Sequence, residues 1–369
     1  MEELRIIISG GGTGGHIFPA VSIANAIKQL KPNAKILFIG AEGRMEMTKV
    51  PAAGYEIKGL PVRGLIRPLW SLKNFGVMRD FFKSKKIVKG IIKEFNPQAV
   101  VGVGGYASSP TLNAAYSLGI PCLIQEQNSF AGVTNKSLGK KAEKICVAYE
   151  GMERFFPKDR IVLTGNPVRQ NLLHVEASKV ECAEEFGMTT DRPIILLVGG
   201  SLGARTLNES VLQNLQAIAE APVQFIWQTG SYYKQHIADE LKEKGKPSNL
   251  YVTDFISHMD KAYKAADLVI SRAGASSISE LCLLGKPSIL VPSPNVAEDH
   301  QTHNAMALVN RQAALYVKDA EATEKLIPLA LKTVVDEKQL ESLGHNAQEM
   351  AYPDSAEVIA EMVLKLTRR

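Results

Sequence analysis

The chain has 369 residues, which exceeds what one hydrophobic core usually organises and therefore predicts two domains. Its composition of 45% hydrophobic and 22% charged residues excludes a disordered or fibrous protein. The formal net charge of +5 is mildly basic, and alone it does not separate a nucleic-acid binder, a membrane-surface protein and an enzyme for phosphorylated substrates.

The N-terminal stretch MEELRIIIS carries two acidic residues and runs directly into a predicted strand, unlike a secretory signal peptide. No apolar run approaches the roughly 20 residues that span a bilayer. The cysteines lie far apart without CxxC spacing, and we expect small buried residues at Cys122, Cys146, Cys182 and Cys282. These features predict a cytoplasmic protein with reduced thiols.

Short apolar runs rich in β-branched residues alternate with longer segments of helical periodicity, which is typical of βαβ units and a parallel sheet. One series of predicted strands covers residues 5–9, 35–40, 55–60, 99–104, 121–127 and 144–149. A second series covers residues 193–200, 223–230, 250–255, 267–274, 287–292 and 313–317. Between the two series, residues 154–170 contain two prolines and a glycine and form a candidate linker.

The two series predict an α/β protein of two doubly wound parallel-sheet domains. We expect the first domain at residues 1–165, the second at residues 166–352, and a final helix at residues 353–369 that could return to the first domain. In such sheets ligands bind at the carboxyl ends of the strands, so two domains that face each other would share one ligand cleft.

The first predicted strand ends in the glycine-rich stretch SGGGTGGH, residues 9–16. This stretch matches GxGxxG, but Glu42, the candidate acid after the next strand, comes later than the usual spacing of about 20 residues. The glycines could instead allow strand and helix to pack closely, which leaves Thr13 and His16 unexplained. His16 lies where the helix macrodipole keeps an imidazole neutral and able to accept a proton, although an isolated histidine as often caps its helix or fills the core.

Residues 62–93 hold nine Lys and Arg against one acid, Asp80. Apolar and aromatic side chains are interleaved with these charges, namely Leu65, Ile66, Leu69, Trp70, Phe75, Phe81 and Phe82. The pattern favours docking on an anionic bilayer surface, where each Lys or Arg contributes about 1 kcal/mol. An ordinary amphipathic helix with a solvated basic face is the alternative, and the stretch contains no recognisable nucleic-acid-binding module.

Polar groups also follow later strands of the first series. The loop GVGGYASSP, residues 102–110, offers backbone amides beside Tyr106, and the next strand ends in Glu126, Gln127 and Asn128. Polar side chains at a strand exit usually face ligand or solvent. For Glu126 a ligand-facing role and a loop-bracing role are equally open.

The second half repeats the glycine turn twice. Gly199, Gly200 and Ser201 precede a predicted helix, where free amides and a positive dipole end suit phosphate oxygens. Residues 274–277 open another helix, and Glu280, one turn in, could accept hydrogen bonds from a ribose diol or merely complement the helix dipole.

A polar loop then enters a further helix with Glu298, Asp299, His300, Gln301 and Asn304. His300 and His303 are three residues apart without a third ligand, so we expect no metal. The sequence contains neither Asp-x-Asp nor a Walker lysine motif. A bound diphosphate would therefore need helix N-termini and a cation such as Arg169.

Six ordered motifs over most of the chain resemble the MurG family, the bacterial glycosyltransferases of peptidoglycan synthesis: GGTGGHIFPA, GVGGYASSP, EQNSFAGVTNK, GNPVR, GGSLGAR and RAGASSISEL. The resemblance implies a GT-B fold of two Rossmann-like domains, with the acceptor bound mainly by the first and the UDP-sugar mainly by the second. It also implies transfer of N-acetylglucosamine from UDP-N-acetylglucosamine, with inversion and without a cofactor. The acceptor would be the 4-hydroxyl of N-acetylmuramic acid in undecaprenyl-linked lipid I, and the product lipid II.

By matching motif, the resemblance implies roles for particular residues. His16 would be the general base, with Glu126 as the second candidate. The donor would be held by Thr13, Gly14, Gly15, Asn128, Arg169, Ser201, Ile256 through its backbone, Ala275, Ser276, Ser277, Ile278, Ser279, Glu280 and Gln301. Thr302 stands where some members of the family have a second glutamine, which weakens the sugar contacts expected there.

The resemblance favours a peripheral protein on the cytoplasmic face of the cell membrane, with an anionic lipid surface as a partner and no nucleic acid. Two alternatives are kept open. A UDP-N-acetylglucosamine 2-epimerase of the same fold would convert the donor without an acceptor, and a non-catalytic nucleotide-binding membrane partner would bind the donor without turnover.

Overall fold

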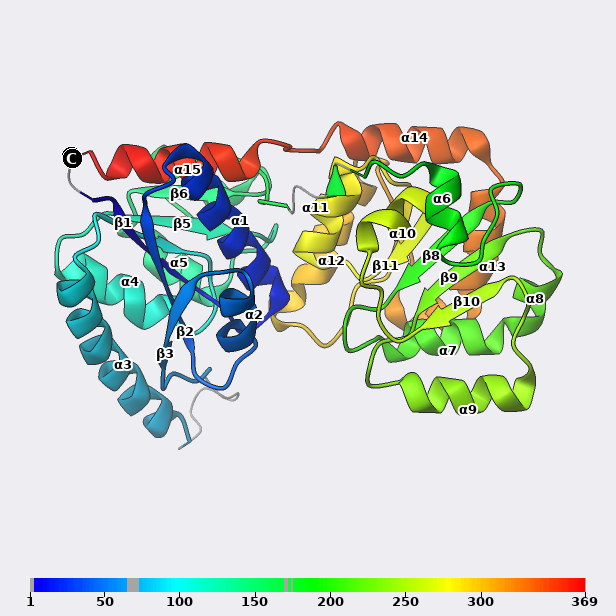
Figure 1. Ribbon diagram of the computed structural model, residues 1–369, viewed down its shortest axis with the longest axis horizontal. Helices are drawn as coiled ribbons and strands as arrows, with labels where there is room; N and C mark the ends of the chain where they lie inside the picture. Colours follow the sequence, from blue (N-terminus) through cyan, green and yellow to red (C-terminus); the bar gives the residue numbers. More distant parts are fainter. Residues whose placement is uncertain (1–2, 65–72, 169–171, 174, 369) are drawn as a thin grey trace. The chain divides into compact units, whose positions relative to one another are not determined.

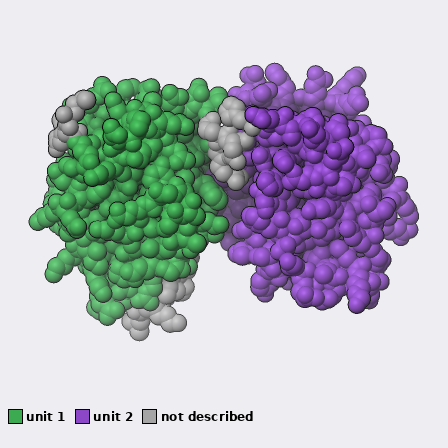
Figure 2. All heavy atoms as spheres, viewed as in Figure 1, with its two compact units in different colours: residues 1–168, 352–369 green, residues 169–351 purple. Residues whose placement is uncertain are grey.

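The computed structural model describes residues 3–64, 73–168, 172–173 and 175–368, and Figure 1 shows the course of the chain. Its internal contacts divide the chain into two compact units, which are coloured separately in Figure 2. Unit 1 comprises residues 1–168 and 352–369, and unit 2 comprises residues 169–351. The last segment of the sequence therefore belongs to the same unit as the first.

Unit 1 is built on a seven-stranded sheet in the order β3-β2-β1-β4-β5-β6-β7, and every pair of neighbours is parallel. The order reverses between β1 and β4, which is the switch point where open α/β sheets bind ligands. The strands are β1 (Arg5–Ser9), β2 (Lys35–Ala41), β3 (Glu56–Leu60), β4 (Ala99–Gly102), β5 (Cys122–Glu126), β6 (Lys144–Val147) and β7 (Ile161–Leu163).

The strand β7 shows that the predicted linker at residues 154–170 is wrong in part. It lies inside that range and pairs in parallel with β6, with Ile145 opposite Ile161. The prediction weighted the proline and glycine punctuation and overlooked three consecutive apolar residues, two of them β-branched, that favour a strand.

The helices of unit 1 cover the sheet and include one from the end of the sequence. They are α1 (Gly14–Leu30), α2 (Glu46–Ala52), α3 (Lys73–Phe95), α4 (Ser108–Ser117), α5 (Val133–Gly139) and α15 (Ser355–Leu366). In Figure 1 the red helix α15 lies beside the blue helix α1. Ile359, Ala360 and Val363 recur at helical spacing on α15 and pack with Ile23 and Ile27 of α1 in one buried cluster. This packing fixes the helix that follows the first glycine turn.

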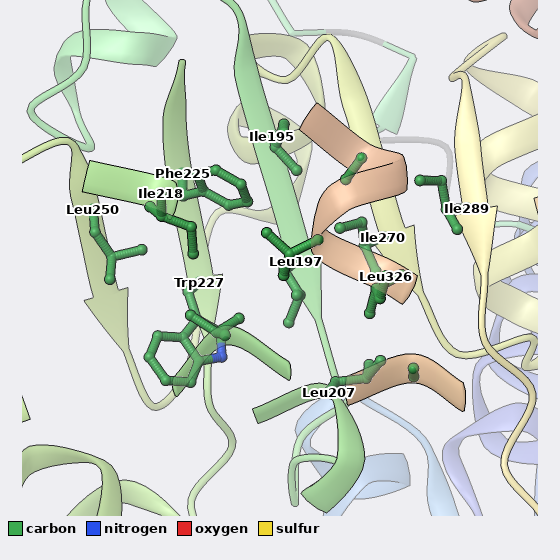
Figure 3. Close-up of a cluster of buried hydrophobic side chains, with 14 of the residues drawn as sticks. Ile195, Leu197, Leu207, Ile218, Phe225, Trp227, Leu250, Ile270, Ile289 and Leu326 are labelled. Carbon is green, nitrogen blue, oxygen red and sulfur yellow. The ribbon is translucent and has the colours of Figure 1, made fainter. Parts of the chain in front are cut away.

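Unit 2 contains a six-stranded sheet in the order β10-β9-β8-β11-β12-β13, again parallel throughout. Its switch point lies between β8 and β11. Figure 3 shows the apolar cluster on the sheet, in which Phe225, Trp227 and Leu197 are fully buried. The strands are β8 (Ile194–Val198), β9 (Gln224–Gln228), β10 (Leu250–Thr253), β11 (Leu268–Ser271), β12 (Ser288–Leu290) and β13 (Leu315–Tyr316).

The helices of unit 2 follow the strands in the expected alternation. They are α6 (Lys179–Glu184), α7 (Arg205–Gln213), α8 (Leu215–Glu220), α9 (Lys234–Lys244), α10 (Met259–Ala265), α11 (Ala275–Leu283), α12 (His300–Val309), α13 (Ala322–Val334) and α14 (Glu337–Gln348). The predicted α/β fold with two doubly wound parallel sheets is confirmed.

The four cysteines are buried and free, as predicted. Burial raises the pKa of every one of these thiols, to about 12 for Cys146 and Cys282, so they stay protonated near neutral pH and are poor nucleophiles. Among the helices that the structure describes, none is both long enough and apolar enough to cross a membrane.

Candidate active site

The first glycine turn lies at the carboxyl edge of the unit 1 sheet, between β1 and α1. Thr13 is the N-cap of α1, and His16 lies in its first turn. The Thr13 hydroxyl is 3.2 Å from Nδ1 of His16. Thr13 is exposed and His16 is half-buried, so the two side chains are open to solvent rather than packed in the core. This exposure excludes the reading of His16 as a core histidine.

A second glycine turn, after β4, packs against the first across the switch point. Gly104 and Gly105 both have positive φ values, of 93° and 86°. A Cβ on Gly105 would overlap the backbone of Gly11, and a Cβ on Gly104 would lie 2.9 Å from Cδ2 and Nε2 of His16. The imidazole therefore rests on a glycine surface that has no room for a side chain.

Glu126 ends β5 and is nearly inaccessible, with 2% of its surface exposed. Its carboxylate accepts from the backbone N–H of Asn128 at 3.1 Å, the N–H of Gly132 at 3.1 Å and Nδ2 of Asn135 at 2.9 Å. Burial raises the pKa of Glu126, and these N–H donors oppose the rise. Of the two roles left open by the sequence, the contacts support the loop-bracing one.

Asn128, which the sequence predicts to hold the sugar, is half-buried beside this carboxylate. Its Nδ2 donates to Oε1 of Glu126 at 3.3 Å. Glu126 therefore sets the orientation of the Asn128 amide.

A buried polar network under the loop was not predicted. Gln125 donates to Asn166 at 2.9 Å, and Asn166 donates to the carbonyl of Gln127 at 3.0 Å. Oε1 of Gln127 and Oδ1 of Asn135 are buried with no hydrogen-bond partner among the described residues. The one signal in the sequence was the number of amide side chains around the end of the strand at residues 121–127, in a region otherwise apolar.

The acid considered for a dinucleotide ribose, Glu42, is exposed. Besides Glu126, a second acid at this edge is buried, namely Glu46, which is 1% exposed and was not predicted from the sequence. Its position at the start of a helix just after a strand was the available signal.

Unit 2 carries the corresponding turns at its own carboxyl edge. Residues 199–203 follow β8, and α7 begins only at Arg205, so Ser201 lies in the turn and not at the first residue of the helix. Ser201 is exposed, and its carbonyl accepts from the backbone N–H of Ser231 at 3.1 Å. After β11 the chain enters α11 directly, with Gly274 as the N-cap, as predicted.

The start of α11 carries six of the fourteen residues that the sequence predicts to hold the donor. Glu280 is 6% exposed and accepts from the Tyr263 hydroxyl at 3.2 Å. Ser279 donates to the carbonyl of Ala275 at 2.9 Å, whereas the hydroxyl of Ser276 is buried with no partner in the described part of the chain. Ala275 is buried, and Ser277 is half-buried.

Ile278 does not fit the predicted set. Its side chain is 1% exposed in the core, and its N–H donates to the carbonyl of Gly274 at 3.0 Å. The side chain packs in the core and the N–H is part of the helix, because Ile278 lies on the buried face of α11.

The polar loop before α12 and the helix itself are linked by hydrogen bonds to neighbouring turns, including the turn between β11 and α11. Glu298 and Asp299 have positive φ values of 57° and 49°, a conformation that costs energy in residues other than glycine and often marks a ligand site. Gln301 accepts from the Ser293 N–H at 2.8 Å, and Asn304 is fully buried and donates to the carbonyl of Ala273 at 3.3 Å.

Ile256 lies in the turn after β10. The residue is 4% exposed, so its side chain is part of the core and the predicted contact would have to come from its backbone. No group of three or more His, Cys, Asp or Glu that could hold a metal ion is found within the described residues.

Helix α3 presents the basic and aromatic stretch. Its inner face buries Val77, Ser84 and Val88, whereas Phe75 is 83% exposed and Phe82 is 62% exposed on the other face. Phe81 is half-buried against Phe82, with ring centroids 5.5 Å apart. Leu65, Ile66, Leu69 and Trp70 of the predicted patch, and Arg169 of the predicted donor site, lie outside the described residues.

The chain matches known proteins over its whole length. Residues 6–147 match the glycosyltransferase family 28 N-terminal domain, and residues 194–359 match the family 28 C-terminal domain. The UDP-N-acetylglucosamine–N-acetylmuramyl-(pentapeptide) pyrophosphoryl-undecaprenol N-acetylglucosamine transferase of Phocaeicola vulgatus is 62% identical, over 99% of this chain and 97% of its own length. The protein of the same name from Bacteroides fragilis is 60% identical, over 100% of this chain and 97% of its own length.

Among solved structures, the crystal structure of MurG from Acinetobacter baumannii is 28% identical and has a TM-score of 0.78. The match covers 98% of this chain and 99% of that one. Two parallel-sheet units with family 28 domains are the GT-B arrangement that the sequence predicts. The chain therefore belongs to the MurG family of glycosyltransferases.

Proposed function

We propose that this chain transfers N-acetylglucosamine from UDP-N-acetylglucosamine to the 4-hydroxyl of N-acetylmuramic acid in undecaprenyl-linked lipid I, with inversion, to form lipid II. The observation that carries this proposal is the identity of about 60% with transferases of that name from end to end. That identity also favours the transferase over the epimerase, because the epimerase reading rested on fold alone.

Unit 1 supplies the acceptor side of the proposed reaction. The attacking hydroxyl must lose its proton as it bonds to the anomeric carbon, and a neutral imidazole is a suitable base near pH 7. His16 is partly exposed beside the switch point, and Thr13 holds its Nδ1. When Nδ1 carries the proton and donates to Thr13, Nε2 is left to accept the proton of the acceptor.

Unit 2 supplies the donor side. The leaving diphosphate gains negative charge in the transition state, and backbone N–H groups at a helix N-terminus stabilise such charge. The start of α11 offers these groups together with the buried Ser276 hydroxyl, and Glu280 is held by Tyr263 as a ribose ligand. The proposed donor set also includes other residues of unit 2, namely Arg169, Ser201, the Ile256 backbone and Gln301. From unit 1 it includes Thr13, Gly14, Gly15 and Asn128.

The reaction is tested by incubating the chain with radiolabelled UDP-N-acetylglucosamine and a short-chain lipid I analogue, beside a control without acceptor. We expect labelled lipid product that depends on the acceptor. Donor consumed equally without acceptor would support the epimerase, and donor binding without product would support the non-catalytic partner.

Gly104→Ala tests whether catalysis depends on the position of the His16 imidazole. The added Cβ would lie 2.9 Å from the imidazole and push it out of place, and a misplacement of about 1 Å costs up to about a hundredfold in rate. We expect kcat to fall by about tenfold to a hundredfold while the affinity for UDP, measured by calorimetry, stays unchanged.

Gly119→Ala is the matched control, because Gly119 has a positive φ of 73° in the same unit and no atom within 4 Å of an added Cβ. It carries a similar backbone strain of about 1 kcal/mol or more without touching the site. An equal loss of kcat in both variants would contradict the proposed contact with His16.

We also propose that α3 docks the protein peripherally on the cytoplasmic face of the cell membrane. Phe75 and Phe82 are exposed on a face that also carries Lys83 and Lys86. An ordinary solvated helix face would explain the lysines but not the exposed aromatic rings. Exposed apolar side chains beside basic ones suit an anionic lipid surface.

Phe75→Ser with Phe82→Ser should weaken binding to vesicles that contain anionic phospholipid by at least about tenfold. Each buried Phe side chain contributes on the order of 1.5–3 kcal/mol. Cosedimentation with vesicles measures the effect, and Val335→Ser in unit 2, at a side chain that is 58% exposed, is the control. Binding equal to the wild-type chain would contradict the assignment of α3.

A further inference from the structure

Glu46 is a buried acid that joins two turns of unit 1. It is the first residue of α2, and it is 1% exposed. Its Oε2 accepts from the backbone N–H of Gly12 at 2.8 Å, and its Oε1 accepts from the backbone N–H of Ala41 at 3.0 Å. Gly12 belongs to the turn between β1 and α1, and Ala41 ends β2, the neighbouring strand.

The side chain fits closely between these turns. A Cβ on Gly11 would overlap the Glu46 carboxylate, and a Cβ on Gly40 would lie 2.6 Å from its Cγ. Glycines at both positions therefore make room for this acid.

An exposed acid at the same position would complement the dipole of α2 equally well. Burying a carboxylate, by contrast, costs several kcal/mol unless its oxygens are satisfied by hydrogen bonds. The dipole of α2 therefore does not account for the burial of Glu46, whereas the two backbone contacts do.

We infer that Glu46 is a positioning residue that fixes the first glycine turn so that Thr13 and His16 meet the acceptor. The inference rests on the proposed function. Gly12, whose N–H Glu46 binds, directly precedes Thr13, the N-cap of α1. Thr13 in turn contacts Nδ1 of His16, so the carboxylate is linked to the base by two hydrogen bonds joined through the Gly12–Thr13 peptide bond.

The same contact bears on what the turn can bind. Glu46 takes the Gly12 N–H, and a GxGxxG turn that binds a dinucleotide offers its amides and helix N-terminus to a pyrophosphate. The Gly12 N–H is therefore not available to a pyrophosphate, which argues against a dinucleotide at this turn.

Glu46→Gln tests the role with almost no change of shape. A glutamine keeps one acceptor oxygen but turns an NH₂ group toward the second backbone N–H, so one of the two contacts is lost. We expect kcat to fall by about tenfold to a hundredfold while the affinity for UDP, which is proposed to bind unit 2, stays unchanged. Hydrogen exchange of the Gly12 or Ala41 amide should become faster in the variant.

Gln98→Ala is the matched control. Gln98 accepts from the backbone N–H of Arg5 at 2.6 Å, at the opposite edge of the same sheet, so its loss removes a similar contact away from the site. We expect this variant to keep the wild-type kcat even if its melting temperature falls as far as that of Glu46→Gln.

The inference is overturned if Glu46→Gln keeps the wild-type kcat, or if Gln98→Ala loses kcat equally at an equal loss of melting temperature. Unchanged exchange of both the Gly12 and Ala41 amides would also overturn it. A wild-type chain without acceptor-dependent transfer would instead count against the proposed function, and the exchange measurement would still test the contact.

Discussion

His16→Ala should lower kcat for transfer to a lipid I analogue by about two to four orders of magnitude, because general-base catalysis contributes about 10² to 10⁴ in rate. Binding of UDP-N-acetylglucosamine should be unchanged, since the nucleotide site is proposed in unit 2. Steady-state kinetics with both substrates, together with calorimetry of the donor, measure the two quantities separately. Near-normal turnover would remove His16 from the mechanism.

The control is His236→Ala, which removes an exposed histidine on α9 in unit 2 and should keep the wild-type kcat. The pH dependence of kcat/KM adds a second readout. A general base gives the profile an acid limb, and if His16 is that base, His16→Ala should lack the limb. An acid limb unchanged in His16→Ala would identify a different base.

The features predicted best from the sequence are those that repeat within it. The alternation of apolar strands and helices predicts both sheets, and the glycine turns fall at the carboxyl edges as expected. His16 could be found because it directly follows Gly15 at a junction of strand and helix. Local signals of this kind need no knowledge of distant contacts.

The features that sequence reasoning missed depend on contacts between distant residues. Glu46 lies 34 positions from Gly12, and Asn166 lies 41 positions from Gln125, so neither hydrogen bond has a local pattern. The strand β7 was not predicted because prolines and a glycine flank it in the sequence, whereas it forms through pairing with β6. Ile278 was included in the donor set by its place in a motif, whereas its burial makes it a core residue.

The choice between His16 and Glu126 shows the same limit. Both residues follow strands at the same edge, and sequence position alone does not separate a base from a brace. The four backbone and side-chain donors around the Glu126 carboxylate favour His16 as the proposed base, because a carboxylate already bound by the loop is poorly placed to take a proton from a substrate.

Glu126→Ala should therefore act mainly on stability. The change removes the acceptor of the half-buried Asn128 N–H, the exposed Gly132 N–H and the buried Asn135 amide, and a buried group left unsatisfied costs about 1–3 kcal/mol. We expect the free energy of unfolding to fall by about 1–3 kcal/mol, measured by urea titration. Asp191→Ala, at an exposed acid of unit 2, should change it by less than about 0.5 kcal/mol.

Glu126→Gln distinguishes a role as catalytic base from a role as brace of the loop. The difference in stability between this variant and the wild-type chain should also depend on pH. Burial raises the pKa of Glu126 above that of an unfolded glutamate, so its contribution to stability is full below about pH 4 and falls as the pH rises through the folded pKa. Glutamine does not ionise, so the stability advantage of the wild-type chain over Glu126→Gln should narrow as the pH rises above about 4 and through the raised pKa of Glu126. If Glu126 braces the loop, Glu126→Gln should keep measurable turnover once its loss of stability is offset by low temperature. A folded Glu126→Gln chain with turnover as low as that of His16→Ala would instead make Glu126 the base, since glutamine fills the same space and accepts no proton.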